Sequence, residues 1–108
     1  MKYISKELTI DKVKIQDVAK KFGTPTYCYA YKQLKENINN FKKNFKSFSP
    51  LICFAIKSNT NLNLIKEVKK FGLGADVVSI GELMIALKAG INPKKIVFSG
   101  VGKTSNEI

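Results

Sequence analysis

Lys57 differs from the other lysines of the sequence in its surroundings. It ends the most apolar run of the chain, residues 51–57, whereas the others lie in polar or amphipathic stretches. Alternation along a strand would place its side chain on the face of Cys53 and Ala55, where small neighbours leave space beside the amine. Burial disfavours a charged ammonium, and a neutral amine can condense with an aldehyde. The alternative is a lysine at a strand end that extends its ammonium into solvent.

Acidic and hydroxyl side chains follow in the next apolar segments. Asp76 opens the segment 74–79, and in a parallel sheet it would lie near Lys57, where it could hold an ammonium or accept a hydrogen bond from a cofactor. It could equally be an ordinary polar residue at a strand start. Ser79 and Glu82 have the spacing of a helix capping box, which by itself could explain both. Ser79 and Ser99 end predicted strands and could contact a ligand or cap a helix.

The composition argues against several other kinds of site. The 108 residues include 19 Lys+Arg, all of them lysine, 8 Asp+Glu and no histidine. Zinc sites and serine triads therefore lack their usual histidine, and we expect no metal. Gly102, Lys103 and Thr104 resemble the end of a phosphate-binding loop, but Val97 stands where that motif needs its first glycine. We therefore reject a nucleotide-binding loop.

The net charge of +11 allows a function in nucleic-acid binding. The lysines are scattered, however, and their densest groupings are pairs. Lysines attract phosphate without reading bases, so this is the weakest of our hypotheses. Cys28 and Cys53 lie in apolar stretches without a Cys-x-x-Cys motif, which predicts two buried reduced thiols. No secretory signal or membrane span is readable, so we expect a cytoplasmic protein.

The apolar pattern predicts an α/β framework around these residues. Residues 13–22 predict a short helix, residues 26–31 a strand with alternating tyrosines, and residues 32–45 an amphipathic helix. Beyond residue 50, buried strands and helices alternate, with strands at 51–56, 75–79 and 95–99 and helices at 61–71 and 81–89. The inward helix residues are Leu64, Ile65, Val68, Leu83 and Leu87, with Met84 as a further candidate. This order predicts βαβ units with parallel strands, which have their sites at the carboxyl ends of the strands.

A second capping box stands close to the end of the sequence. Thr104 and Glu107 have the spacing of a capping box, which predicts a helix after them. The sequence stops at Ile108, however. We therefore expect the 108 residues to be the front of a longer α/β protein.

Four stretches, in order and at suitable spacing, resemble the N-terminal portion of the diaminopimelate decarboxylases, an alanine-racemase-like, fold-type III family of pyridoxal-phosphate enzymes. They are FGTPTYCYA (22–30), CFAIKSNTN (53–61), GLGADVVSIGEL (72–83) and KKIVFSGVGKT (94–104). The resemblance covers nearly the whole chain from about Leu8. It implies about three βα units from the N-terminal part of a TIM (β/α)8 barrel. Residues 1–31 would be a leading segment that packs with a β domain, and residues 32–108 a truncated pyridoxal-phosphate-binding barrel domain.

The resemblance also implies a site and a reaction. Lys57 lies in the pyridoxal-lysine motif, so it would bind pyridoxal 5'-phosphate covalently. Asp76 matches an aspartate near the cofactor, and Glu82 a glutamate after it, with Ser79 as possible support. The implied reaction is decarboxylation of meso-2,6-diaminopimelate to L-lysine, by a lyase that is a homodimer when intact. The family's other cofactor- and substrate-binding residues fall after Ile108, so we expect the chain alone to be inactive.

Two other functions remain open from the sequence. The chain could belong to a non-enzymatic pyridoxal-phosphate-binding barrel protein, or it could be the small basic nucleic-acid-binding protein considered above. The specific GADVVS and FSGVGKT stretches argue against the first of these. We expect an amino-acid substrate, no specific nucleic acid and no membrane as partners.

Overall fold

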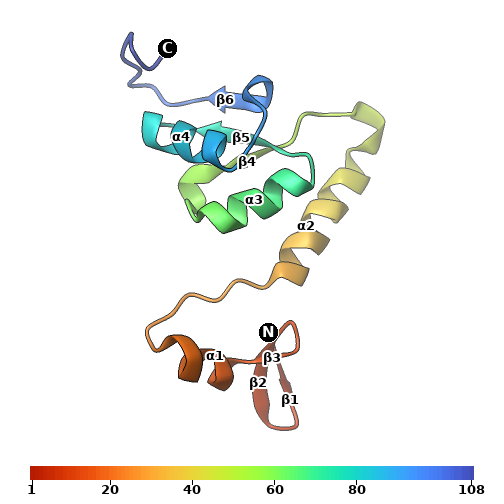
Figure 1. Ribbon diagram of the computed structural model, residues 1–108. Coiled ribbons are helices and arrows are strands. Elements are labelled where there is room, and N and C mark those ends of the chain that lie inside the picture. Colours follow the sequence, from red (N-terminus) through yellow and green to blue (C-terminus); the bar gives the residue numbers. More distant parts are fainter. The chain divides into compact units, whose positions relative to one another are not determined.

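The chain separates into two units in its computed structural model, which describes residues 1–108 (Figure 1). The first unit is Met1–Ser47 and the second is Phe48–Ile108. The expected boundary between residues 31 and 32 stays a prediction. No helix of the chain is both long enough and apolar enough to cross a membrane.

The second unit is built on a parallel three-stranded sheet, as the sequence predicts. Its strands are β4 (Cys53–Ala55), β5 (Gly74–Val77) and β6 (Ile96–Phe98), in the order β4-β5-β6. Helices α3 (Leu62–Lys70) and α4 (Ile80–Lys88) connect them, and two 3-10 turns complete the unit, η2 (Ile56–Ser58) and η3 (Pro93–Lys95). Both β4 and β6 pair with β5 alone, so each leaves its outer edge unpaired.

The two faces of this sheet have different surroundings. Ala75 and Val77 of β5 point to the helical side and are fully buried, together with Ile56, Ile65 and Ala86. Register places Asp76 beside Ala55 of β4 and Val97 of β6, all on the opposite face. Val97 is 48% exposed there. The sheet thus has one closed apolar face, on which the unit folds, and one face that carries a carboxylate.

The helices of the second unit begin and end where the sequence predicts. The Asn61 side chain accepts hydrogen bonds from the amides of residues 63 and 64 and caps α3, and Ser79 caps α4. Gly72 and Gly90 follow the two helices with φ of 76° and 85°, where a residue without Cβ is favoured. The expectation that Leu87 points inward is wrong, and so is that for Met84, which is 60% exposed. Leu87 is 40% exposed because it lies on a groove between α4 and β6 that is open to solvent.

The first unit contains an antiparallel sheet that the sequence patterns did not indicate. Its strands are β1 (Lys2–Ile4), β2 (Glu7–Ile10) and β3 (Val13–Lys14), followed by helix α1 (Ile15–Phe22). Both hairpin turns have two central residues with positive φ, Ser5-Lys6 and Asp11-Lys12. Such turns usually carry Asn-Gly or Asp-Gly, and the lack of glycine explains why the signal was missed.

The predicted strand at residues 26–31 is wrong. Residues 26–30 form no regular element, and Tyr31 begins helix α2 (Tyr31–Asn44), which confirms the helix expected at 32–45. Alternation alone does not make a strand, since a strand also needs a hydrogen-bonded neighbour, and this segment has none. Tyr27 is 91% exposed. Cys28 is also exposed rather than buried, and both cysteines are free.

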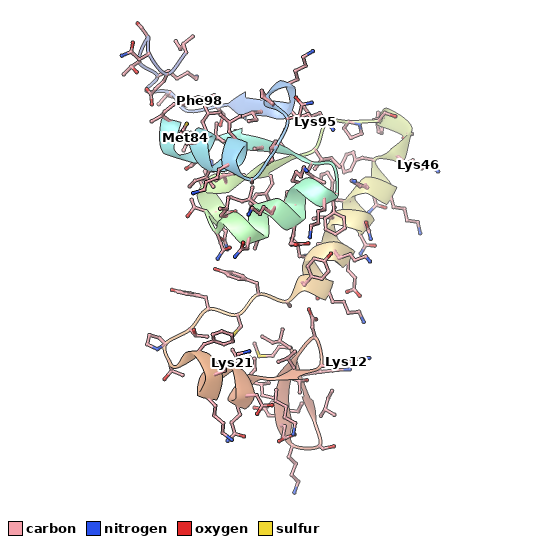
Figure 2. The ribbon with its side chains drawn as sticks, in the orientation of Figure 1. Lys12, Lys21, Lys46, Met84, Lys95 and Phe98 are labelled. Carbon is pink, nitrogen blue, oxygen red and sulfur yellow. The ribbon has the colours of Figure 1, made fainter.

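Lysines are spread over both units and favour helix ends (Figure 2). Three helices carry lysine pairs in their last turn: Lys20-Lys21 in α1, Lys42-Lys43 in α2 and Lys69-Lys70 in α3. Cations at a helix C-terminus interact favourably with the helix dipole. The pairs therefore have a structural role that does not require a nucleic acid.

Candidate active site

Lys57 lies in a turn directly after β4. The strand ends at Ala55 and the chain enters the 3-10 turn η2, so strand alternation does not extend to Lys57, contrary to expectation. The turn is closed by the Ser58 hydroxyl, which donates to the carbonyl of Ala55 at 2.7 Å, and by the Asn59 amide, which donates to Ile56 at 2.9 Å. Ile56 is fully buried in the core. The turn thus anchors the backbone beside Lys57 while its amine is exposed to solvent.

Asp76 and Ser99 meet at the same end of the sheet. Asp76 lies next to Ala55 in register and is half-buried. The Ser99 hydroxyl donates to Oδ1 of Asp76 at 2.5 Å, and the Ser99 amide donates to the carbonyl of Val77 at 2.9 Å. The sequence allowed Ser99 either to contact a ligand or to cap a helix. Within this chain Ser99 does neither. Sequence patterns did not indicate this pairing, because its partners are 23 residues apart.

Lys57 thus follows the strand next to the one that carries Asp76, yet no ion pair joins them within the chain. Lys57 follows β4 by two residues, and Asp76 is the register partner of the last β4 residue. Neighbouring strands lie about 4.8 Å apart, so an amine, a carboxylate and a hydroxyl gather at one sheet end. An accessible amine at the same sheet end as a carboxylate can bind a carbonyl compound that carries a hydrogen-bond donor.

Ser79 and Glu82 form the predicted capping box of α4. The Glu82 amide donates to Oγ of Ser79 at 3.3 Å, and Oε2 of Glu82 accepts from the amide of Val78 at 2.9 Å. The side chain of Glu82 thus reaches one residue before the N-cap itself. Capping explains the spacing of both residues, and their contact with a ligand stays a prediction.

The other end of the sheet face is closed by close packing. The Cys53 thiol reaches across β5 and donates to the carbonyl of Lys95 at 3.8 Å. Burial raises the pKa of this thiol, and the charge of Asp76 raises it further. Cys53 is therefore held as a neutral thiol, which is a weak nucleophile.

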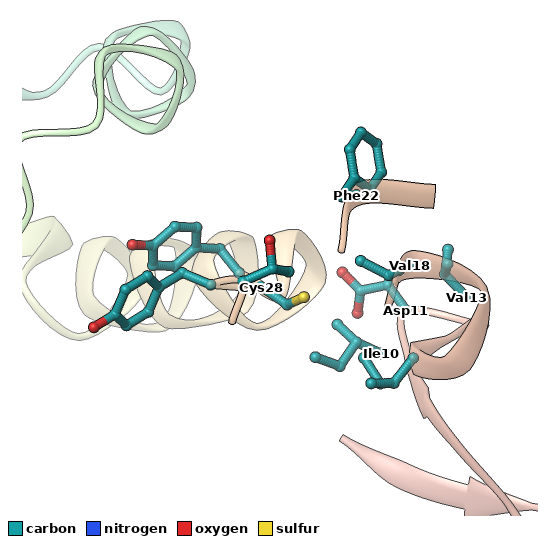
Figure 3. A pocket seen from close by; sticks show the side chains of 10 residues that line it. Ile10, Asp11, Val13, Val18, Phe22 and Cys28 are labelled. Carbon is teal, nitrogen blue, oxygen red and sulfur yellow. The ribbon is translucent and has the colours of Figure 1, made fainter. Parts of the chain in front are cut away.

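A mostly apolar hollow in the first unit offers no comparable chemistry. It has a volume of about 450 Å³ and is lined by residues of the β2–β3 turn, α1 and the segment after it (Figure 3). Its one acid, Asp11, accepts a hydrogen bond from the backbone amide of Lys32 at 2.8 Å. No lysine lines this hollow, so it offers no amine for an aldehyde.

Comparison with known proteins agrees with this location. The family model described as the pyridoxal binding domain of pyridoxal-dependent decarboxylases matches residues 31–108. The diaminopimelate decarboxylase of Aquifex aeolicus is 44% identical over 108 residues, which is all of this chain and 25% of that protein. That of Helicobacter pylori strain J99 is 47% identical over 93 residues, 86% of this chain and 23% of the relative.

Solved structures show the same likeness. The diaminopimelate decarboxylase from M. jannaschii matches with a TM-score of 0.93 and 38% identity, over 98% of this chain and 26% of that chain. The Helicobacter pylori enzyme complexed with L-lysine matches with a TM-score of 0.82 and 44% identity, over 87% and 24% of the two chains.

The chain spans about a quarter of the length of the curated relatives it matches. Its parallel strands and helices are consistent with the N-terminal part of a TIM barrel, as the sequence predicts. A family match over residues 31–108 covers most of the chain and all of its candidate site. The chain therefore belongs to the pyridoxal-dependent decarboxylases and carries sequence of their pyridoxal binding domain.

Proposed function

We propose that Lys57 binds pyridoxal 5'-phosphate and that the whole protein decarboxylates meso-2,6-diaminopimelate to L-lysine. The observation that carries the proposal is the exposed amine of Lys57, held by an anchored turn at the carboxyl end of β4 inside the matched domain. The relatives with 44% and 47% identity are named diaminopimelate decarboxylases, and one related structure contains L-lysine.

The residues present fit the cofactor. Its aldehyde needs a reachable primary amine, which Lys57 supplies. The half-buried carboxylate of Asp76 can accept a hydrogen bond from a ring substituent or from the amine itself. Ala55, the register partner of Asp76, precedes Lys57 by two residues and has a small side chain. When bound, pyridoxal phosphate supplies an electron sink for the pair left by departing carbon dioxide.

Each residue has a defined task in this proposal. Lys57 would hold the aldehyde through Nζ once its ammonium has lost a proton to solvent, since only the neutral amine has a free electron pair, and the aldehyde oxygen would leave as water. Asp76 orients a donor at the sheet end, and Ser79 with Glu82 supports the loop between β5 and α4. The chain contributes three of the eight strands that a barrel requires. We therefore expect weak cofactor binding and no turnover from these 108 residues alone.

We further propose, by resemblance, that the intact protein is a homodimer in the cytoplasm.

The experiment that tests the cofactor site uses the chain itself. It is incubated with pyridoxal phosphate, treated with borohydride and digested, and the modified lysine is found by mass spectrometry. We expect the adduct on Lys57 and its loss in Lys57→Ala. Lys66→Ala, which removes an exposed lysine of α3, is the matched control and should keep the adduct.

A chimera tests the reaction. The matched quarter of the Aquifex aeolicus relative is replaced by this chain, with which it is 44% identical. We expect release of carbon dioxide from diaminopimelate that Lys57→Ala abolishes. Cofactor binding without release would favour the non-enzymatic pyridoxal-phosphate protein. Modification spread over many lysines, unchanged in Lys57→Ala, would contradict the site.

A further inference from the structure

We propose that Ser99 is a positioning residue that fixes the carboxylate of Asp76 for the cofactor. The proposal rests on the proposed function, because it assigns Asp76 a donor on the bound cofactor. It adds a residue to which the sequence patterns gave no role of this kind.

The contact between the two side chains is short and involves a charge. Oγ of Ser99 lies 2.5 Å from Oδ1 of Asp76, at the short end of the range for a hydroxyl that donates to a carboxylate. Bonds of this kind are about twice as strong as those between neutral groups. The bond uses Oδ1 and leaves Oδ2 of Asp76 for a second donor.

The backbone places Ser99 independently of this bond. Its amide donates to the carbonyl of Val77 at 2.9 Å, which extends the pairing of β5 and β6 by one residue. The next residue, Gly100, lies so close to the carbonyl of Val78 that a Cβ would collide with it and would come within 3.0 Å of the Phe98 ring. The chain can follow this path only with glycine there, and the path presents Oγ to Asp76.

The bond from Ser99 is expected to hold the Asp76 carboxylate in one orientation. Asp76 is half-buried on the face of the sheet opposite the helices, and the Ser99 hydroxyl bonds to its carboxylate there. The Ser99 hydroxyl selects one orientation, and this preorganisation removes part of the ordering cost of binding. Ser99 is itself exposed, so its substitution removes the hydroxyl with little loss of packing.

A double-mutant cycle tests the proposal in the 108-residue chain. The variants are Ser99→Ala, Asp76→Ala, both together, and Ser99→Thr. The rate of borohydride-trapped adduct formation at Lys57 is measured at fixed pyridoxal phosphate concentration. We expect Ser99→Ala to slow the reaction roughly tenfold, as loss of a charge-assisted hydrogen bond does. Ser99→Thr should restore most of the rate, since it keeps a hydroxyl.

The cycle separates positioning from a purely structural link between β5 and β6. If Ser99 acts through Asp76, its removal has no further effect once Asp76 is alanine. An equal slowing in both backgrounds would overturn the proposal, and so would an unchanged rate in Ser99→Ala. Ser105→Ala, which removes another exposed hydroxyl, controls for the substitution itself and should react like the parent chain.

The two proposals fail in different ways. Adduct loss in Lys57→Ala with a normal Ser99→Ala rate overturns the role of Ser99 and leaves the proposed function standing. An adduct that persists in Lys57→Ala overturns the proposed function. The same variants in the Aquifex aeolicus chimera, read by absorbance of the bound cofactor, give a second measurement. If neither protein binds the cofactor, both proposals are wrong.

Discussion

Gly74 allows the Cys53 thiol to reach across the middle strand of the sheet. The two residues are register partners on β4 and β5. Because Gly74 has no side chain, Sγ of Cys53 passes over it to the Lys95 carbonyl at the start of β6. All three strands are therefore in contact at one end, while Asp76 and Ser99 link two of them at the other.

Gly74→Ala should destabilise the second unit. The new Cβ would collide with the carbonyl of Lys95 and come within 2.9 Å of Sγ of Cys53. Overpacking of this kind costs about 1–3 kcal/mol, which a urea titration of the free energy of unfolding measures. Gly81→Ala is the matched control, because its nearest neighbour would be the Ser79 oxygen at 3.8 Å. Equal stabilities of the two variants would contradict this account.

The two cysteines should differ in their reaction with iodoacetamide. Cys28 is exposed, whereas burial and the charge of Asp76 raise the pKa of Cys53 above its usual 9.0. Mass spectrometry at pH 8 should find Cys28 modified first, and the rate at Cys53 should keep rising beyond pH 9.0. Asp76→Asn should speed modification of Cys53 at fixed pH without a large change in access. Modification of both thiols at the same rate at pH 8 would contradict the partial burial and the raised pKa of Cys53.

The same thiol gives a pH dependence of stability. A raised pKa in the folded state means that the neutral thiol is favoured by folding. The contribution of the neutral Cys53 thiol to the free energy of unfolding is present below the ordinary pKa. It is lost as pH rises through the pKa of the folded state. The free energy of unfolding of the parent chain should therefore fall more steeply than that of Cys53→Ala on the alkaline side of pH 9.0.

Glu107 should titrate below its usual pKa of 4.5. The amide of Thr104 donates to its Oε2 at 2.8 Å, and the Thr104 hydroxyl donates at 2.9 Å. Both bonds lower the pKa, the amide more than the hydroxyl. Thr104→Val should therefore raise the pKa only part of the way back, as measured by carboxyl NMR. The stabilisation from these bonds is present above the ordinary pKa and lost as pH falls through the folded value. A full return to 4.5 in Thr104→Val would assign the whole effect to the hydroxyl.

Asp11→Gly should weaken the start of α2. The N-cap residue Ala30 has no side chain that can cap, and Asp11 supplies the acceptor for the Lys32 amide from the β2–β3 turn. Glycine tolerates the φ of 48° at this position, so the change isolates the lost cap, worth about 1 kcal/mol. Hydrogen exchange of the Lys32 amide should accelerate. Lys12→Gly, at φ 72° in the same turn, should leave that amide protected, and acceleration in both variants would point to the turn instead.

The parallel unit could be predicted because its signals are local. Buried strands read as continuous apolar runs, and the cap at Ser79 and the stops at Gly72 and Gly90 lie within a few residues of the helices they bound. Such features depend on neighbours in sequence and are visible without the fold.

The features that escaped prediction depend on distant partners or on turn chemistry. The hairpins turn at Ser5-Lys6 and Asp11-Lys12, which carry no turn signature. Tyr27 and Tyr29 alternate like a strand but have no neighbour to pair with. The apolar run 51–57 indicates that Lys57 follows a strand, but alternation does not reveal the turn that exposes it. The bond from Ser99 to Asp76 follows from register, which no single segment encodes.

The unpaired outer edges of β4 and β6 make the solution behaviour of this chain depend on salt. Free amide and carbonyl groups on an edge are templates for pairing with another copy. At low ionic strength the net charge of +11 keeps copies apart. Added salt shortens the range of this repulsion to a few ångströms and leaves the edges free to meet. We therefore expect the isolated chain to stay dispersed through charge repulsion between its lysines and to associate when salt screens that repulsion.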